Sequence, residues 1–172
     1  IQDLSKGMAQ KVQFIATVIH QPDLLILDEP FSGFDPVNAE IIKNEILELK
    51  RQGTTIILST HRMESVELLC DQIALINRAR KVLDGPVKTI KNEAKTNRFL
   101  VKLIPDTSAT ALPLEDGVSR EGYLEFTVEL QGRQPNSLLR ELMEQGEILG
   151  FEEIIPSIEE IFIQKINESH AG

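Results

Sequence analysis

The sequence predicts an α/β fold, in which a layered domain with a mostly parallel sheet is followed by a small α+β domain. Short apolar runs at residues 24–27 and 54–59 alternate with segments of helical periodicity, as in sheets whose strands are joined by helices. Beyond residue 95 the strand candidates instead alternate between apolar and polar residues. The charge changes at the same point, because residues 1–95 hold 12 basic and 13 acidic residues and residues 96–172 hold 6 and 14. We therefore expect two domains, 1–95 and 96–172.

The composition indicates a soluble protein with an acidic second half. A chain of 172 residues with 41% hydrophobic residues can bury a core. No apolar run approaches the roughly 18 residues of a membrane-spanning helix, and Ile1 begins no targeting segment. The single cysteine, Cys70, cannot form an internal disulfide, which favours the cytoplasm. Nucleic-acid phosphates would repel the acidic second half, so we expect no nucleic-acid partner.

The first domain should begin with an amphipathic helix over residues 8–19. Ser5 is a suitable N-cap for it, and Pro22 stops it. The run at residues 24–27 is apolar throughout, which is typical of a parallel strand buried on both faces. Residues spaced by three and four predict the buried face of the helix: Met8, Val12, Ile15, Ala16 and Ile19.

A second helix is predicted to start at Asp35 and Pro36, with the carboxylate as N-cap and proline at the first helical position. Gly53 is expected to end it. The predicted order then continues with a strand at 54–59, a helix at 63–70, a strand at 72–76, a hairpin at 81–84 and a helix ending near residue 95.

The second domain is expected to have the order β-β-α-β-α. Ser157 and Glu160 form a capping box that starts its last helix, which should run to Ile166. No catalytic constellation is found here, so an accessory role, regulatory or dimer-stabilising, is the hypothesis to test. The other predicted elements are strands at 99–104, 123–130 and 148–155 and a helix at 136–144.

Two adjacent carboxylates, Asp28 and Glu29, end the first apolar strand. The carboxyl ends of parallel strands border the crevice in which open α/β sheets bind ligands. We interpret Asp28 as a ligand of Mg²⁺, directly or through water, and Glu29 as the group that orients or deprotonates an attacking water. The alternative is that the pair only begins a solvated turn before Pro30.

The carboxylate pair belongs to a series of four motifs in a fixed order. Leu-Ser-Lys-Gly-Met occupies residues 4–8, Leu-Leu-Ile-Leu-Asp-Glu-Pro residues 24–30, Ser-Gly-Phe-Asp residues 32–35 and Ser-Thr-His residues 59–61. With these motifs, the chain resembles the ATP-hydrolysing subunit of an ABC transporter over about residues 1–90. The part beyond residue 80 is similar to bacterial sodium and antibiotic exporters. The resemblance implies the C-terminal part of a P-loop NTPase-like domain, with ATP and Mg²⁺ as cofactors.

The resemblance also implies roles for individual residues. Ser5, Lys6 and Gly7 match the signature loop, which contacts the γ-phosphate of a nucleotide held by the opposite subunit, and Gln10 is grouped with them as a nucleotide-binding candidate. Lys6 stands where the family usually has glycine. Asp35 matches the loop that crosses the dimer interface and also suits an N-cap. His61 matches the switch histidine, which helps hold Glu29 and the attacking water.

One motif of the family is absent from the 172 residues: Gly-x-x-x-x-Gly-Lys-Ser/Thr, the loop that cradles the phosphates. We therefore expect Ile1 to begin partway through the domain and the chain alone to be inactive. The intact protein is expected to form a homodimer at the inner face of the cell membrane. There it is expected to power transport, in the direction of export, through separate transmembrane subunits. The alternatives are a non-transport ABC ATPase of DNA repair or ribosome function, or a non-enzymatic interaction module.

Overall fold

The computed structural model describes residues 5–106, 117–120 and 122–170, and it contains both helices and strands. The chain divides into two compact units. The first consists of residues 1–87 with 162–172, and the second of residues 88–161. The predicted α/β class is confirmed by a parallel strand pair with helices before, between and after its strands. The predicted domain boundary near Lys95 stays a prediction.

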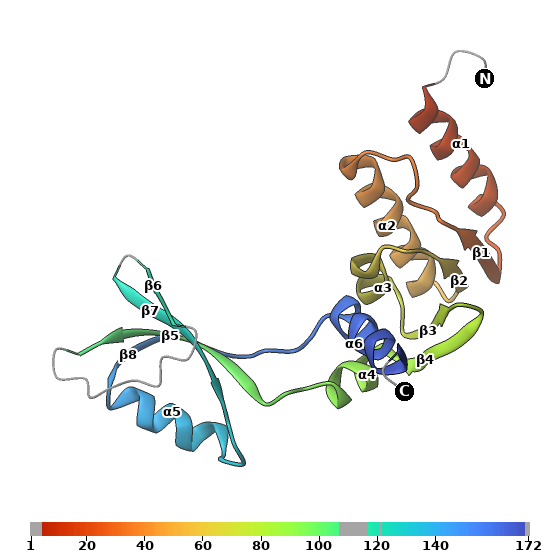
Figure 1. Ribbon diagram of the computed structural model, residues 1–172. Coiled ribbons are helices and arrows are strands. Elements are labelled where there is room, and N and C mark those ends of the chain that lie inside the picture. The colour runs from red at the N-terminus through yellow and green to blue at the C-terminus, as the bar shows by residue number, and fades with distance from the viewer. Residues whose placement is uncertain (1–4, 107–116, 121, 171–172) are drawn as a thin grey trace. The chain divides into compact units, whose positions relative to one another are not determined.

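The first unit contains a parallel strand pair (Figure 1). Its register runs from Leu24 opposite Thr55 to Asp28 opposite Ser59, so both strands end at the same edge. The core beside it consists of Phe31, Ile42, Ile46 and Leu69. The elements in order are α1 (Lys6–Val18), β1 (Leu24–Asp28), α2 (Pro36–Arg51), β2 (Thr55–Ser59) and α3 (Met63–Leu69).

The third predicted strand is present but does not join this parallel pair. Strand β3 (Gln72–Asn77) pairs antiparallel with β4 (Arg80–Pro86) in a sheet of its own. Arg78 and Ala79, the two residues between the strands, have φ angles of 48° and 59°. Positive φ at both central residues is the geometry of a two-residue hairpin turn, so local turn geometry decides the pairing.

The predicted burial of α1 and β1 is wrong for the described part of the chain. The predicted inner face of α1 is exposed, from 48% at Val12 to 74% at Ile19, and α1 reaches the core through Phe14 instead. In β1, Ile26 is 67% exposed whereas Leu25 is 3% exposed. Spacing shows which residues share a face, but burial requires a second element to cover that face, and no described element does.

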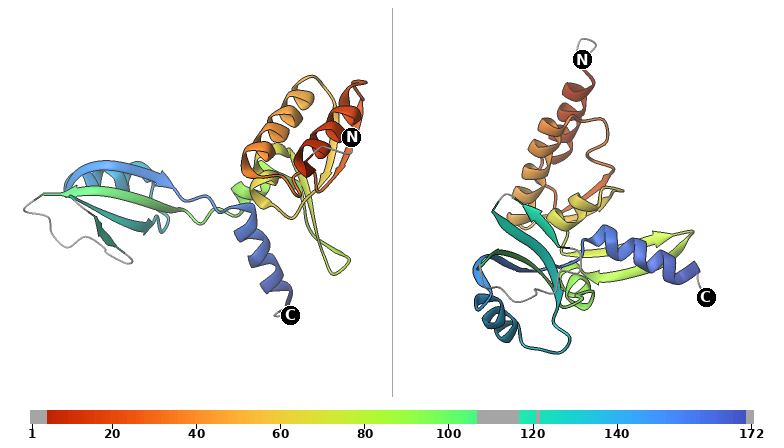
Figure 2. Two further views of the ribbon diagram at one scale, coloured as in Figure 1. Left: turned by 90° about the horizontal axis from the view of Figure 1, so that it is seen from above. Right: turned by 60° about the vertical axis from the view of Figure 1, so that its left-hand side comes forward.

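The second unit is a four-stranded antiparallel sheet in the order β6-β7-β5-β8, with α5 along one side (Figure 2). Its core includes Phe99, Phe126 and Leu138. Gly146 begins β8, and a Cβ at this position would lie 2.0 Å from the carbonyl oxygen of Ile104, so the strands approach too closely for a side chain. The elements are α4 (Val87–Glu93), β5 (Arg98–Pro105), β6 (Val118–Arg120), β7 (Tyr123–Glu129), α5 (Pro135–Met143) and β8 (Gly146–Glu153).

The predicted capping box of the last helix, α6 (Ile158–His170), is confirmed. The backbone N–H of Ser157 donates to Oε2 of Glu160 over 2.7 Å, and the N–H of Glu160 donates to Oγ of Ser157 over 3.2 Å. The two bonds satisfy donors that a helix start otherwise leaves free. The pKa of Glu160 is held below its ordinary value mainly by the backbone N–H of Ser157 and then by the Ser157 hydroxyl, which donates to the same Oε2 over 2.9 Å. The helix continues four residues beyond its predicted end, Ile166.

Asp35 caps α2 as predicted. Its Oδ1 accepts the backbone N–H of Asn38 over 3.0 Å, and Pro36 is the first residue of the helix. The backbone and side-chain hydrogen bonds from Asn38 hold the pKa of Asp35 below its ordinary value of 3.8. These bonds favour the ionised carboxylate, so they stabilise the fold only while Asp35 is charged.

We expect the cap at Asp35 to make stability depend on pH in acid. Because the folded pKa lies below 3.8, its contribution is present above that pH and is lost as the pH falls through the folded pKa. Asparagine caps helices equally well but does not titrate. The free energy of unfolding, measured with urea, should therefore fall more steeply below about pH 4 for the wild type than for Asp35→Asn. Equal slopes for the two proteins would contradict the assigned role.

Candidate functional site

The candidate site lies where β1 and β2 end together. The backbone N–H of Glu29, the residue after β1, donates to the carbonyl oxygen of Ser59 over 3.0 Å, which extends the pairing by one step. Glu29 has a φ of 44°, in the left-handed region that non-glycine residues seldom adopt. Backbone strain of this kind is concentrated at functional sites. The turn brings the Glu29 side chain to the residues that follow β2.

Glu29 and His61 are joined by two hydrogen bonds. Oε1 of Glu29 accepts the backbone N–H of His61 over 3.0 Å, and the ring Nδ1 of His61 lies 2.8 Å from the same oxygen. Because a carboxylate oxygen accepts, Nδ1 carries a proton in this contact, and Nε2 is left for another partner. The His61 side chain is 78% exposed and that of Glu29 is 34% exposed, so the pair is open to a ligand.

Thr60 contacts the other oxygen of the same carboxylate. Its Oγ1 lies 3.4 Å from Oε2 of Glu29 and accepts the backbone N–H of Arg62 over 3.1 Å. The hydrogen of Thr60 is therefore available for Glu29, since an N–H can only donate. Three groups from the segment after β2 thus hold the Glu29 carboxylate in one orientation.

Asp28 is hydrogen-bonded to Ser59, whose Oγ donates to Oδ1 of Asp28. The described residues contain no group of three or more His, Cys, Asp or Glu side chains that could hold a metal ion. Mg²⁺ nevertheless usually takes only one or two protein carboxylates and completes its shell with water and substrate phosphate. An exposed carboxylate at the carboxyl end of a parallel strand fits that donor set.

Ser5 and Gly7 lie at the start of α1, and no hydrogen bond or ion pair within the described residues joins them to the Glu29 cluster. Ser5 caps the helix, because its Oγ accepts the N–H of Met8 over 3.3 Å. A Cβ at Gly7 would meet nothing within 4 Å, so packing inside this chain does not require glycine there. The side chain of Lys6 lies outside the described residues.

Gln10, the remaining nucleotide-binding candidate on α1, is hydrogen-bonded within the chain. Its Nε2 donates to the carbonyl oxygen of Ser32 over 2.8 Å, which ties α1 to the loop between Glu29 and Asp35. Its Oε1 is buried and has no hydrogen-bond partner in the described part of the chain. Asp35 itself caps α2, and in the described ranges no hydrogen bond or ion pair joins it to Glu29 or His61.

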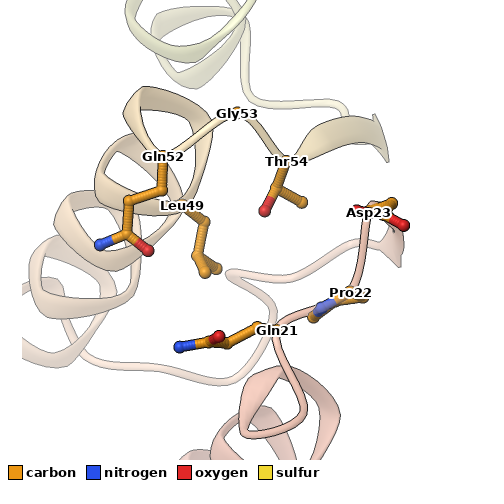
Figure 3. Close-up of a pocket in the computed structure, with 7 residues that line it drawn as sticks. All are labelled: Gln21, Pro22, Asp23, Leu49, Gln52, Gly53 and Thr54. Carbon is orange, nitrogen blue, oxygen red and sulfur yellow. The ribbon is translucent and has the colours of Figure 1, made fainter.

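A pocket of about 320 Å³ lies at the opposite end of the strand pair, beside the residues that precede β1 and β2 (Figure 3). Its side chains are mainly polar, and Asp23 is the charged residue among them. The pocket is therefore separate from the carboxylates, and we assign it no part in the site. It is lined by Gln21, Pro22, Asp23, Leu49, Gln52, Gly53 and Thr54.

Of the residues named from the sequence, the structure brings together Asp28, Glu29 and His61. Sequence reasoning gave no role to Ser59 and Thr60, although both belong to the motif that ends in His61. Each hydroxyl contacts one of the two adjacent carboxylates. The sequence did contain a signal for these contacts. Two adjacent hydroxyl residues stand where the second parallel strand ends, and Ser59 lies opposite Asp28 in the register.

Comparison with known proteins finds a family match in each part of the chain. The family described as "ATP-binding protein DrrA1-3-like, C-terminal domain" matches residues 85–166, and that described as "AAA domain, putative AbiEii toxin, Type IV TA system" matches residues 1–67. An ABC transporter ATP-binding protein of Alkalihalophilus pseudofirmus is 41% identical over 99% of this chain and 64% of its own length. YhaQ of Bacillus subtilis, also named an ABC transporter ATP-binding protein, is 39% identical over 96% of this chain and 56% of its own.

A third relative bears the name of a drug exporter. The fluoroquinolones export ATP-binding protein of Mycobacterium tuberculosis is 48% identical over 49% of this chain and 28% of its own length. These matches place the chain in the class of ATP-binding proteins. The chain belongs to the family of ABC transporter ATP-binding proteins. It spans less than two thirds of the length of these relatives. Members of this family are in general ATPases that dimerise and work with membrane subunits.

Proposed function

We propose that this chain is part of an ATP-hydrolysing subunit of an ABC transporter, with the hydrolytic residues at the carboxyl ends of β1 and β2. The observation that carries the proposal is the pair of hydrogen bonds between His61 and Glu29, the residue that follows Asp28. A carboxylate held so firmly and yet open to solvent is suited to orient a water molecule and take its proton. The four sequence motifs and the family membership support the same assignment.

In this proposal Glu29 acts on the attacking water. His61 and Thr60 hold its carboxylate, so little reorientation is needed when the nucleotide is bound. Glu29 does not use the ring Nε2 of His61, which can donate to a phosphate oxygen when it also carries a proton. Asp28 would hold Mg²⁺, directly or through water. An ion held there would supply positive charge that offsets the charge developing on the phosphate.

Ser5 and Gly7 are proposed to bind the nucleotide of a second subunit. The free N–H groups at the start of α1 and the helix dipole favour an anion. Gly7 supports this role. Glycine lowers the stability of a helix, and packing within the described residues does not require it at this position, so close approach of a ligand would explain its presence. The proposed active form is therefore a homodimer. The further proposal that these 172 residues hydrolyse no ATP by themselves follows from the missing phosphate loop.

Transport is proposed to occur through separate membrane subunits, with the protein on the cytoplasmic face. None of the helices in the described ranges is long and apolar enough to cross a membrane. Export is the proposed direction, on the strength of the relative named for fluoroquinolone export. Residues 96–172 are proposed to be an accessory domain, supported by the family match to a C-terminal domain.

The first test compares two histidines in the full-length gene product. His61→Ala removes the ring contact with Glu29 but keeps the backbone bond, so ATP hydrolysis should fall roughly 10- to 1000-fold with nucleotide binding retained. A phosphate-release assay measures the rate, and a fluorescent nucleotide measures binding.

His20→Ala is the matched control, since His20 is exposed and follows α1 away from the carboxylates. Hydrolysis by this variant should stay within about twofold of the wild type, as for most surface substitutions. If His61→Ala hydrolyses ATP at the wild-type rate, the proposed site is wrong. A wild-type protein without Mg²⁺-dependent hydrolysis would contradict the proposed function as a whole.

A further inference from the structure

Ser59 contacts both residues of the carboxylate pair. It is the last residue of β2 and lies directly opposite Asp28 in the parallel register. Its Oγ is hydrogen-bonded to Oδ1 of Asp28, and it also lies 3.3 Å from the backbone nitrogen of Glu29. One hydroxyl therefore links the side chain of one carboxylate residue to the backbone of the next.

The direction of these two hydrogen bonds follows from their donors. The N–H of Glu29 can only donate, so the Ser59 oxygen accepts it. A hydroxyl carries one hydrogen, which is then left for Oδ1 of Asp28, an acceptor in its ionised form. The result is a chain of two bonds that runs from Glu29 through Ser59 to Asp28. Its direction fixes the orientation of the hydroxyl.

We propose that Ser59 is a positioning residue that holds the Asp28 carboxylate in one rotamer and presents its other oxygen, Oδ2, to a divalent cation. The inference rests on the proposed function of Asp28 as a metal ligand. An exposed aspartate samples several staggered χ1 wells, and a hydrogen bond to one oxygen selects one of them. Groups that orient a metal ligand commonly change metal affinity by about 10- to 100-fold.

A role in folding does not account for the Ser59 hydroxyl. The N–H of Glu29 also donates to the backbone oxygen of Ser59 over 3.0 Å, so this N–H keeps a partner when the side chain is removed. Ser59 itself is exposed, and its removal leaves no cavity. We therefore expect Ser59→Ala to fold like the wild type, which makes the positioning role testable.

The rotamer of Asp28 can be measured without nucleotide or metal. In the full-length gene product labelled with ¹³C and ¹⁵N at aspartate, three-bond couplings to Cγ report χ1 of Asp28. We expect one χ1 well in the wild type, averaging among wells in Ser59→Ala, and a single well again in Ser59→Thr, which retains the hydroxyl. Thr55→Ala is the control, because it removes a hydroxyl from the same exposed face of β2 at its other end. Unchanged couplings in Ser59→Ala, or equal averaging in Thr55→Ala, would overturn the proposal.

Metal affinity supplies the second readout. Mn²⁺ can be titrated in the presence of a saturating non-hydrolysable ATP analogue, with the free ion followed by electron paramagnetic resonance. Ser59→Ala should weaken Mn²⁺ binding by roughly 10-fold and Ser59→Thr should restore it. If Ser59→Ala shows averaged couplings but binds Mn²⁺ with the wild-type affinity, the proposed effect of Ser59 on metal binding is refuted. A wild type that binds no nucleotide would refute the proposed function and the metal role, while the couplings would still decide whether Ser59 positions Asp28.

Discussion

Replacement of Glu29 by glutamine is expected to stop ATP hydrolysis in the full-length gene product and to leave nucleotide binding intact. Glutamine has nearly the same shape and its Oε1 can still accept the N–H of His61, but its amide cannot take a proton from water. General-base groups contribute about 100- to 10,000-fold to rate, so hydrolysis should fall by that factor. Single-turnover phosphate release measures the loss, and equilibrium dialysis with labelled ATP measures binding.

Glu40→Gln is the matched control for this substitution. Glu40 lies on α2, and within the described residues its side chain makes one ion pair, with Lys43 over 3.8 Å, so hydrolysis should be unchanged. Turnover by Glu29→Gln at near the wild-type rate would refute the assignment of the base. Loss of both hydrolysis and nucleotide binding would instead indicate a general role in the site.

Removal of a central aromatic ring from either unit is expected to cause the largest losses of stability. Phe126 is 1% exposed and lies in the core of the antiparallel sheet, and Phe31 is 0% exposed in the core beside β1 and β2. Substitution of a buried phenylalanine by alanine costs about 3–5 kcal/mol, because it removes apolar burial and leaves a cavity. Urea unfolding followed by circular dichroism measures each loss.

The same two variants test the proposed division of the chain, since each serves as the control for the other. If the units are separate domains, Phe126→Ala should lower amide-exchange protection in β5, β7 and β8 and leave β1, β2 and α2 protected. Phe31→Ala should have the reverse effect. Equal loss of protection in both units for both variants would contradict the division into two domains.

Sequence reasoning succeeded where a feature depends on residues close together in the chain. The caps at Ser5, Asp35 and Ser157 each bond a backbone N–H three residues ahead, so a short motif contains the whole interaction. The Asp28 and Glu29 pair was found in the same way, from two adjacent letters after an apolar run. Period and turn residues placed most of the helices and strands to within a few residues.

Predictions of burial and pairing failed where a distant element decides the outcome. The apolar face of α1 was expected to be buried, yet no described element covers it. The third strand was expected to continue a mostly parallel sheet, but β3 lies apart from β1 and β2 and pairs antiparallel with β4, in the hairpin that was predicted after it. The hydrogen bond of Gln10 to the backbone of Ser32 also joins distant segments, and the role of Gln10 in nucleotide binding stays a prediction. The roles of the individual site residues stay predictions until the variants are measured.

By itself, therefore, the sequence determined the class of fold, the caps and the identity of the carboxylate pair, because each depends on residue types at short, fixed spacings. Only the tertiary structure decided how those carboxylates are held. The contacts of Ser59 with Asp28, and of Thr60 and His61 with Glu29, join residues 31 or 32 positions apart. They exist because parallel pairing aligns the carboxyl ends of β1 and β2 and a left-handed turn at Glu29 directs its side chain to the segment after β2.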